Sequence, residues 1–149
     1  MGEPVWWLPD YSGRAANREG RFRVMDFPFT EGELVATDGT RMGCSELFVA
    51  VFSGSIILKQ GGRYVFTVES DDGFRLWIDE KKAGEHAGVR AFSGTDMVVT
   101  LAEGAHSLRL EYFNNGRPGG LRFLWTVPGG KRGVVPAEVL RREGAEEIR

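Results

Sequence analysis

Apolar and polar residues alternate along much of the chain beyond residue 60. The runs that place an apolar side chain at every second position are 64–69, 74–79, 97–101, 107–113 and 121–127. A period of two predicts strands that bury one face. Short glycine-rich turns separate the runs, and the chain contains 21 glycines. The pattern predicts an all-β fold, built as an antiparallel β-sandwich or barrel.

The pattern is less regular before residue 60 and between the second and third runs. Residues 22–29 contain Pro28, which cannot donate a ladder hydrogen bond, so they predict an edge strand at most. Residues 46–58 are the most apolar stretch, and Gly54 inside them predicts a bulge or a crossing between sheets. Residues 83–95 show no alternation and predict a loop.

Two adjacent carboxylates, Asp71 and Asp72, lie with Gly73 between the first two alternating runs. Asp-Gly is a strong hairpin signal, so the two runs are predicted to pair as a hairpin that carries the carboxylates at its tip. Two acidic side chains also begin an oxygen ligand set for a hard cation such as Ca²⁺. From these residues alone the tight turn is the simpler interpretation, and a calcium site is the alternative.

Composition narrows the class of protein. A chain of 149 residues, with 42% hydrophobic and 27% charged residues, is typical of a single globular domain. The net charge of −2 provides no broad basic field for nucleic acid or anionic lipid. Cys44 is the only cysteine, which excludes an internal disulfide. No apolar run is long enough to span a membrane.

Motifs of catalysis are absent from the sequence. It contains no G-x-S-x-G, H-E-x-x-H, Walker or dinucleotide-binding pattern. His86 and His106 have no cysteine or carboxylate neighbours at metal-ligand spacing. Asp71 and Asp72 are adjacent, which makes them poor partners across a glycosidic bond, because that chemistry needs two facing carboxylates. We therefore expect no enzymatic activity.

Seven short motifs occur in a fixed order over about two-thirds of the chain. They are F-S-G-S-I at 52–56, G-R-Y-V-F at 62–66, S-D-D-G-F-R-L-W-I-D at 70–79, L-A-E-G-A-H at 101–106, L-R-L-E-Y-F at 108–113, L-R-F-L-W at 121–125 and V-P at 135–136. In this order they resemble the PA14 domain, the family named from the anthrax protective antigen. The resemblance implies an antiparallel β-sandwich of PA14 type, a module of bacterial toxins, glycosidases, adhesins and yeast flocculins.

The resemblance also implies a cofactor. In the sugar-binding members of the family, two aspartates joined by a cis peptide bind Ca²⁺ together with an asparagine that follows a later strand and two backbone carbonyls of the next loop. Matched to this sequence, these ligands are Asp71, Asp72, Asn114 and the carbonyls of Gly116 and Pro118. A sugar with two adjacent hydroxyls then replaces two waters on the ion.

Residues that flank these ligands are expected to determine the specificity for the glycan. The candidates for sugar contact beside the doublet and Asn114 are Arg117, His86 and Arg90. One departure from the family is visible, because the fungal sugar-binding loop carries an aromatic residue near the position of Pro118 and this loop has none. Many PA14 domains keep the aspartate doublet as a structural element, so a module without a sugar ligand remains the alternative.

These observations predict three regions and one function. Residues 1–21 form a divergent segment that packs on or leads into the domain, 22–142 form the PA14-like β domain, and 143–149 form a charged tail. The predicted function is a non-catalytic, Ca²⁺-dependent, lectin-like carbohydrate-binding module of a larger extracytoplasmic or cell-surface protein. The alternative is a structural or protein–protein interaction module. The expected partners are a glycan and the remaining domains of a parent protein.

Overall fold

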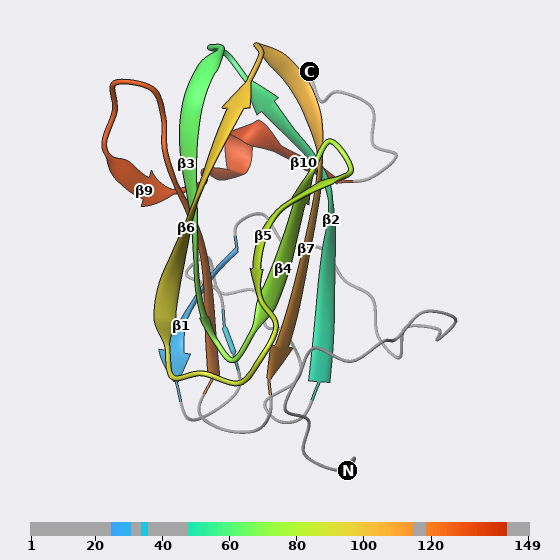
Figure 1. Cartoon of the computed structure of the whole chain (residues 1–149), viewed down its shortest axis with the longest axis vertical. Helices are drawn as coiled ribbons and strands as arrows, with labels where there is room; N and C mark the ends of the chain where they lie inside the picture. The colour runs from blue at the N-terminus through green and yellow to red at the C-terminus, as the bar shows by residue number, and fades with distance from the viewer. Residues whose placement is uncertain (1–24, 31–33, 36–47, 115–118, 143–149) are drawn as a thin grey trace.

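The structure is a computed structural model that describes residues 25–30, 34–35, 48–114 and 119–142. These residues form strands joined by short turns, with one short 3₁₀ helix (Figure 1). The elements are β1 (Asp26–Thr30), β2 (Phe48–Leu58), β3 (Gly62–Asp71), β4 (Phe74–Ile78), β5 (Lys81–His86), β6 (Ser93–Leu101), β7 (Gly104–Asn114), β8 (Gly119–Thr126), β9 (Arg132–Val134), η1 (Ala137–Val139) and β10 (Leu140–Arg142). No helix in these ranges is long and apolar enough to cross a bilayer.

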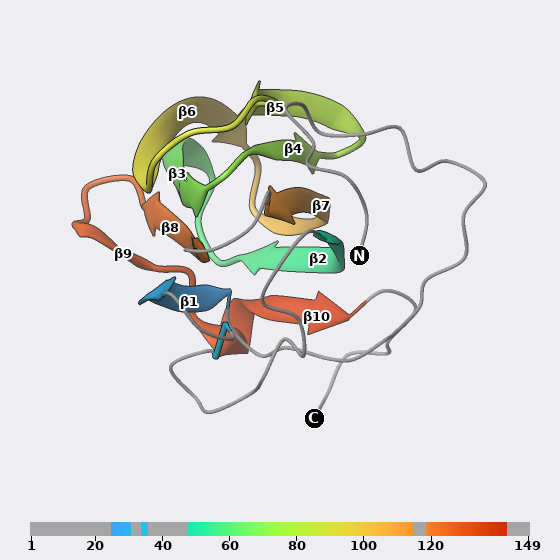
Figure 2. The same ribbon diagram turned by 90° about the horizontal axis from the view of Figure 1, so that it is seen from below.

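The strands form two antiparallel sheets that pack face to face. One sheet has the order β1-β8-β3-β6, with β9 paired to β8, and the other has the order β10-β2-β7-β4-β5. Figure 2, which looks along the strands from below, shows the two layers. The all-β sandwich predicted from the alternating pattern is therefore confirmed.

The predicted hairpin between the first two alternating runs is wrong. β3 pairs with β6 and β8, whereas β4 pairs with β5 and β7, so the two consecutive strands lie in different sheets. The segment of Asp71, Asp72 and Gly73 crosses from one sheet to the other. The physical reason is that the apolar sides of β3 and β4 are both buried in the core between the sheets, where Phe66 and Phe74 are fully buried. The alternation of apolar and polar residues is the same whether two strands pair in one sheet or face each other from two sheets, so it could not tell these cases apart.

Aromatic residues from the first sheet fill much of the core. Phe66 of β3 and Phe123 of β8 stack with ring centroids 5.7 Å apart and planes 7° apart. Tyr64 and Trp125 extend this group along the same two strands. Each fully buried phenylalanine contributes about 1.5–3 kcal/mol of hydrophobic stabilisation. Phe74, the residue that follows the crossing segment, is fully buried in the same core.

Of three predictions about single segments, the structure confirms one and contradicts two. The edge strand near residues 22–29 is confirmed as β1, which lies at the edge of its sheet. The bulge or crossing at Gly54 is wrong, because the pairing of β2 with β7 runs unbroken through that residue. The loop at 83–95 is wrong at both ends, where β5 and β6 lie. β5 is an edge strand with no fully buried residue, and it therefore has no apolar alternation.

Candidate functional site

The aspartate doublet lies at one end of the sandwich, at the bottom of Figure 1, where β3 ends and β4 begins. Asp71 is the last residue of β3, and its peptide bond to Asp72 is cis. Asn114 is the last residue of β7, and β7 runs antiparallel to β4 with Phe74 opposite Tyr112. The end of β7 therefore meets the start of β4, which brings Asn114 to the same end of the molecule as the doublet.

Backbone hydrogen bonds attach the crossing segment to β7. The Asp72 N–H donates to the Phe113 carbonyl at 3.2 Å, and the Phe113 N–H donates to the Gly73 carbonyl at 3.0 Å. Asp71 is 7% exposed, Asp72 is 8% exposed and Asn114 is fully buried. Three polar side chains from two distant parts of the sequence are thus buried together beside the turn.

The Tyr112 hydroxyl joins the doublet to β7 and β8. It donates to the Asp71 carbonyl at 2.6 Å and accepts from the Gly120 N–H at 3.3 Å. Burial raises the pKa of Tyr112, while hydrogen bonds from Gly120 and Asn114 act in the opposite direction. Sequence reasoning assigned Tyr112 only to a strand. The only feature of the sequence that pointed to a role at the site was its position on the apolar side of the strand, two residues before Asn114.

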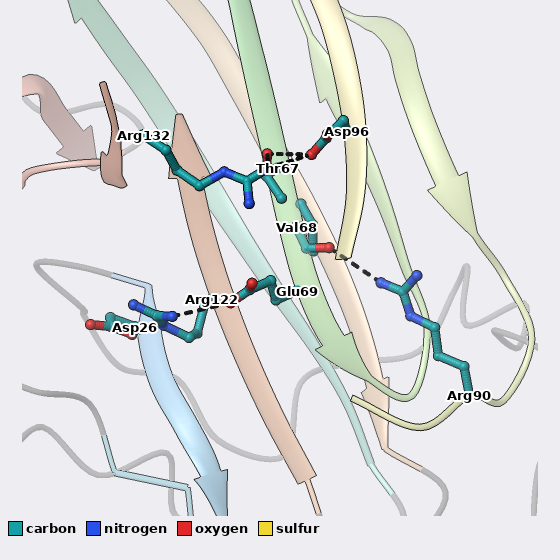
Figure 3. Close-up of polar contacts among 8 residues, drawn as sticks. All are labelled: Asp26, Thr67, Val68, Glu69, Arg90, Asp96, Arg122 and Arg132. Atoms are coloured by element: carbon teal, nitrogen blue, oxygen red, sulfur yellow. Dashed lines mark hydrogen bonds and ion pairs between the residues drawn. The ribbon is translucent and has the colours of Figure 1, made fainter. Parts of the chain in front are cut away.

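Arg90 and Ser70 also form hydrogen bonds with the doublet and with each other. Ser70 Oγ donates to the Asp72 carbonyl at 2.7 Å, and the Arg90 backbone N–H donates to Asp72 Oδ1 at 3.1 Å. The Arg90 guanidinium donates to the carbonyls of Val68 and Ser70 at 3.2 and 3.1 Å, and to Ser70 Oγ and Thr95 Oγ1 at 2.9 and 2.7 Å. Figure 3 shows its bond to Val68. A contact between this guanidinium and sugar would compete with these bonds.

The electrostatics of the doublet favour a cation. Burial is the largest of the effects that raise the pKa of Asp71 to about 7; the charge and the hydrogen bond of neighbouring Asp72 act in the same direction, and the charge of Arg90 opposes them. Two carboxylates held together away from water are stabilised by a positive charge. The donors here are two carboxylates and an amide oxygen, which are the ligands that Ca²⁺ prefers. These residues therefore fit a calcium ion, and their joint ligation of one stays a prediction.

The rest of the predicted site is placed only in part. Gly116, Arg117 and Pro118 lie outside the described residues. His86 ends β5 opposite Phe74, is half-buried, and has Nε2 3.4 Å from the Val89 carbonyl oxygen. Within the described ranges no group of three or more His, Cys, Asp or Glu residues gathers to hold a metal. The predicted ion therefore depends on the amide and the carbonyls as well as on the doublet.

A comparison with known families decides what kind of domain this is. Residues 40–138, more than half of the chain, match the family model described as the PA14 domain. The chain belongs to the PA14 domain family. The resemblance carried by the seven motifs is thus confirmed. No curated protein matches this PA14 domain.

Solved structures share the PA14 fold seen here. An anti-sigma factor domain-containing protein has a TM-score of 0.72 and 17% identity, covering 86% of this chain and 43% of that chain. A PA14 sugar-binding domain from an RTX adhesin has a TM-score of 0.65 and 23% identity, covering 82% and 76%. The Epithelial Adhesin 9 A domain from Candida glabrata, in complex with Galβ1-4GlcNAc, has a TM-score of 0.57 and 16% identity, covering 68% and 54%.

The identities of these three structures to this chain are all below 25%. At such identities they show the fold alone. The chain spans less than half the length of the anti-sigma factor domain-containing protein and about half the length of the Candida glabrata domain.

Proposed function

We propose that this PA14 domain is a non-catalytic, Ca²⁺-dependent carbohydrate-binding module of a larger extracytoplasmic or cell-surface protein. Asp71, Asp72 and Asn114 supply side-chain oxygens to the ion, and the carbonyls of Gly116 and Pro118 complete the protein ligands. Two adjacent hydroxyls of a sugar take the remaining positions on the ion. The proposal keeps His86, Arg90 and Arg117 as the candidate flanking contacts.

One observation carries this proposal: two adjacent carboxylates are buried beside a buried amide at one end of the sandwich. Buried carboxylates are costly unless a positive charge or hydrogen bonds compensate them. Arg90 is the cation whose charge acts on Asp71, and its guanidinium is directed to backbone and hydroxyl oxygens. A divalent ion would compensate the second carboxylate.

The similar structures support the sugar part of the proposal. One of them is described as a sugar-binding PA14 domain of an adhesin, and another contains a galactose-terminated disaccharide. Both are described as parts of adhesins. The proposal assigns the same class of ligand, a neutral glycan with adjacent hydroxyls, to this domain.

Calorimetry and thermal unfolding test the ion directly. Metal-free protein titrated with Ca²⁺ should bind one ion and gain thermal stability, since a ligand of the native state stabilises it by about 2.7 kcal/mol at a hundredfold excess over Kd. The absence of both heat and a rise in Tm would remove calcium from the proposal. Mg²⁺ serves as a control, because it demands a smaller octahedral set.

Two charge-removing variants at the ends of β4 form a matched pair. Asp72→Asn keeps the acceptor for the Arg90 N–H but removes a negative charge, so Ca²⁺ affinity should fall by more than tenfold. Asp79→Asn removes a carboxylate at the other end of the strand, where the side chain is 44% exposed, and should leave Ca²⁺ affinity unchanged. An equal loss in both variants would contradict the proposed ligand set.

A glycan array in Ca²⁺ and in chelator then tests sugar binding. Signals that vanish in chelator and in Asp72→Asn support the proposal. Binding that survives chelator would place the sugar elsewhere on the domain.

One set of contacts favours a second candidate, a structural or interaction module. Ser70, Arg90 and Tyr112 already hold the doublet through hydrogen bonds that involve no ion. In that case Asp72→Asn would lower Tm without any effect of Ca²⁺ on wild-type protein.

A further inference from the structure

Two aromatic rings lie beside the doublet at positions that the motifs did not single out. Phe29 of β1 and Phe92, which immediately precedes β6, have ring centroids 5.5 Å apart and planes 48° apart. Phe29 is 49% exposed and Phe92 is half-buried. Phe29, Val51 and Val98 are the large hydrophobic residues that stand exposed in the described part of the chain. The pair therefore presents aromatic surface to solvent.

A glycine makes room for this pair. Gly120 of β8 lies directly opposite Asp71 of β3. A Cβ atom at Gly120 would lie 2.8 Å from Cε1 of Phe92 and 3.0 Å from Cα of Phe29, so any larger residue would displace them. Residues directly opposite in an antiparallel pair project to the same face of the sheet. The two phenylalanines thus lie on the face to which the Asp71 side chain projects.

The backbone beside each ring is tied to the same end of the sandwich. Thr30, next to Phe29, pairs with Gly119, and Ser93, next to Phe92, pairs with Ser70. Two residues before Phe92, the Arg90 N–H bonds the Asp72 carboxylate. The positions of the rings relative to the doublet are therefore set by strand pairing as well as by side-chain packing.

We propose that Phe29 and Phe92 form the apolar wall of the sugar site, against which a neutral pyranose held at the doublet packs its C–H face. This inference rests on the proposed function. Aromatic rings bind the apolar face of a sugar while its hydroxyls bind polar groups on the other side. Strands β1 and β6 in this way supply the aromatic surface that the loop after Asn114 lacks in sequence. The wall selects pyranosides with an uninterrupted C–H face over open-chain diols.

The test compares Phe29→Ala with Val98→Ala, which trims an exposed apolar residue on β6 that is 54% exposed. Both sites are exposed, so both variants should fold. The probes are methyl β-D-galactopyranoside, methyl α-D-mannopyranoside, methyl α-L-fucopyranoside and glycerol, titrated in saturating Ca²⁺. Phe29→Ala should lose about two- to tenfold in affinity for the pyranoside that wild type binds, with Ca²⁺ affinity unchanged. Val98→Ala should match wild type, and Phe29→Tyr should retain binding.

Three outcomes separate this inference from the proposed function. Unchanged pyranoside affinity in Phe29→Ala, with loss in Asp72→Asn, overturns the aromatic wall and leaves the calcium-dependent site intact. Equal affinity of wild type for glycerol and for the pyranosides also overturns the wall. Failure of wild type to bind any pyranoside in Ca²⁺ overturns the proposed function, and the wall with it.

Discussion

Strand β4 carries an acidic doublet at each end, and the two doublets behave differently. Asp71 and Asp72 precede the strand and are buried, whereas Asp79 and Glu80 follow it and are exposed. The first doublet lies on a crossing between sheets, and the second forms the two-residue turn of the β4–β5 hairpin. Both turn residues there have positive φ, 54° for Asp79 and 65° for Glu80, as primed hairpin turns require.

The partners of the two doublets explain the difference. Asp79 Oδ2 lies 2.6 Å from Nδ1 of His106, whose Nε2 lies 2.7 Å from the Ala102 carbonyl oxygen. Because both neighbours of the ring are acceptors, they raise the pKa of His106 against the effect of burial and favour the charged histidine, which pairs with Asp79. Asp71 instead is buried with a second carboxylate beside it, and burial first and that charge second raise its pKa. Carboxylates of similar sequence context thus form an ion pair with a histidine at one end and a pair of neighbouring carboxyl groups at the other.

The largest expected effect tests how tightly the crossing is packed. A Cβ at Gly73 would lie 2.3 Å from the His86 carbonyl oxygen and 2.5 Å from Cε1 of Phe113. Gly73→Ala should therefore destabilise the fold by about 3 kcal/mol through overpacking. Gly133→Ala, where nothing lies within 4 Å of the added Cβ, should change stability by less than about 0.5 kcal/mol. Urea denaturation measures the free energy of unfolding of both variants. Equal values would show that the segment around Gly73 can move to accommodate the added methyl group.

A smaller loss of stability is expected when the Tyr112 hydroxyl, which joins the doublet to β8, is removed. Tyr112→Phe leaves the Asp71 carbonyl and the Gly120 N–H without this buried partner, which should cost about 1–3 kcal/mol. If Asn114 and the doublet share an ion, the variant should also weaken Ca²⁺ binding, because their relative position is no longer held. Calorimetry with Ca²⁺ and urea denaturation report the two effects separately. If Tyr112→Phe is as stable as wild type, the Tyr112 hydroxyl does not hold the doublet and β8 together.

The pH dependence of stability differs between the two ends, and its component from the His106–Asp79 pair is the smallest expected effect. Burial lowers the pKa of His106, but the Ala102 carbonyl and the Asp79 carboxylate outweigh it and raise the pKa above its usual value. The stabilisation from this pair is therefore complete below about pH 6.5 and is lost as the pH rises through the raised pKa. The pKa of Asp71 is also raised, so its contribution is lost between about pH 4 and 7.

Urea denaturation of metal-free protein across this range distinguishes the ends. The loss from the His106 pair as the pH rises past about 6.5 should be roughly 0.5 kcal/mol, the magnitude of a partly exposed ion pair, and His106→Gln should abolish it. The loss of stability between about pH 4 and 7 should persist in His106→Gln and shrink in Asp71→Asn, with a remainder from Glu111, whose pKa burial also raises. A wild-type profile that His106→Gln leaves unchanged at every pH would contradict the charged histidine.

Sequence patterns found some parts of the site and missed others. The doublet and Asn114 were found because the motifs of residues 70–79 and 108–113 are local. Arg90 was predicted beside the site, but its bonds to Val68, Ser70 and Thr95 were not predictable. Phe29 and Phe92 were missed because they meet only when β1, β8, β3 and β6 assemble in that order.

The sequence by itself determined that this chain forms strands, that it folds as a PA14 domain, and which carboxylates stand next to each other. Periodicity and short motifs are local properties, so they can be read along the chain. Only the tertiary structure decided that β3 and β4 face each other across the core, and that Tyr112 and the doublet are joined. The physical reason is that an alternating strand exposes one apolar side regardless of its neighbour, and the partner is chosen by packing between segments distant in sequence.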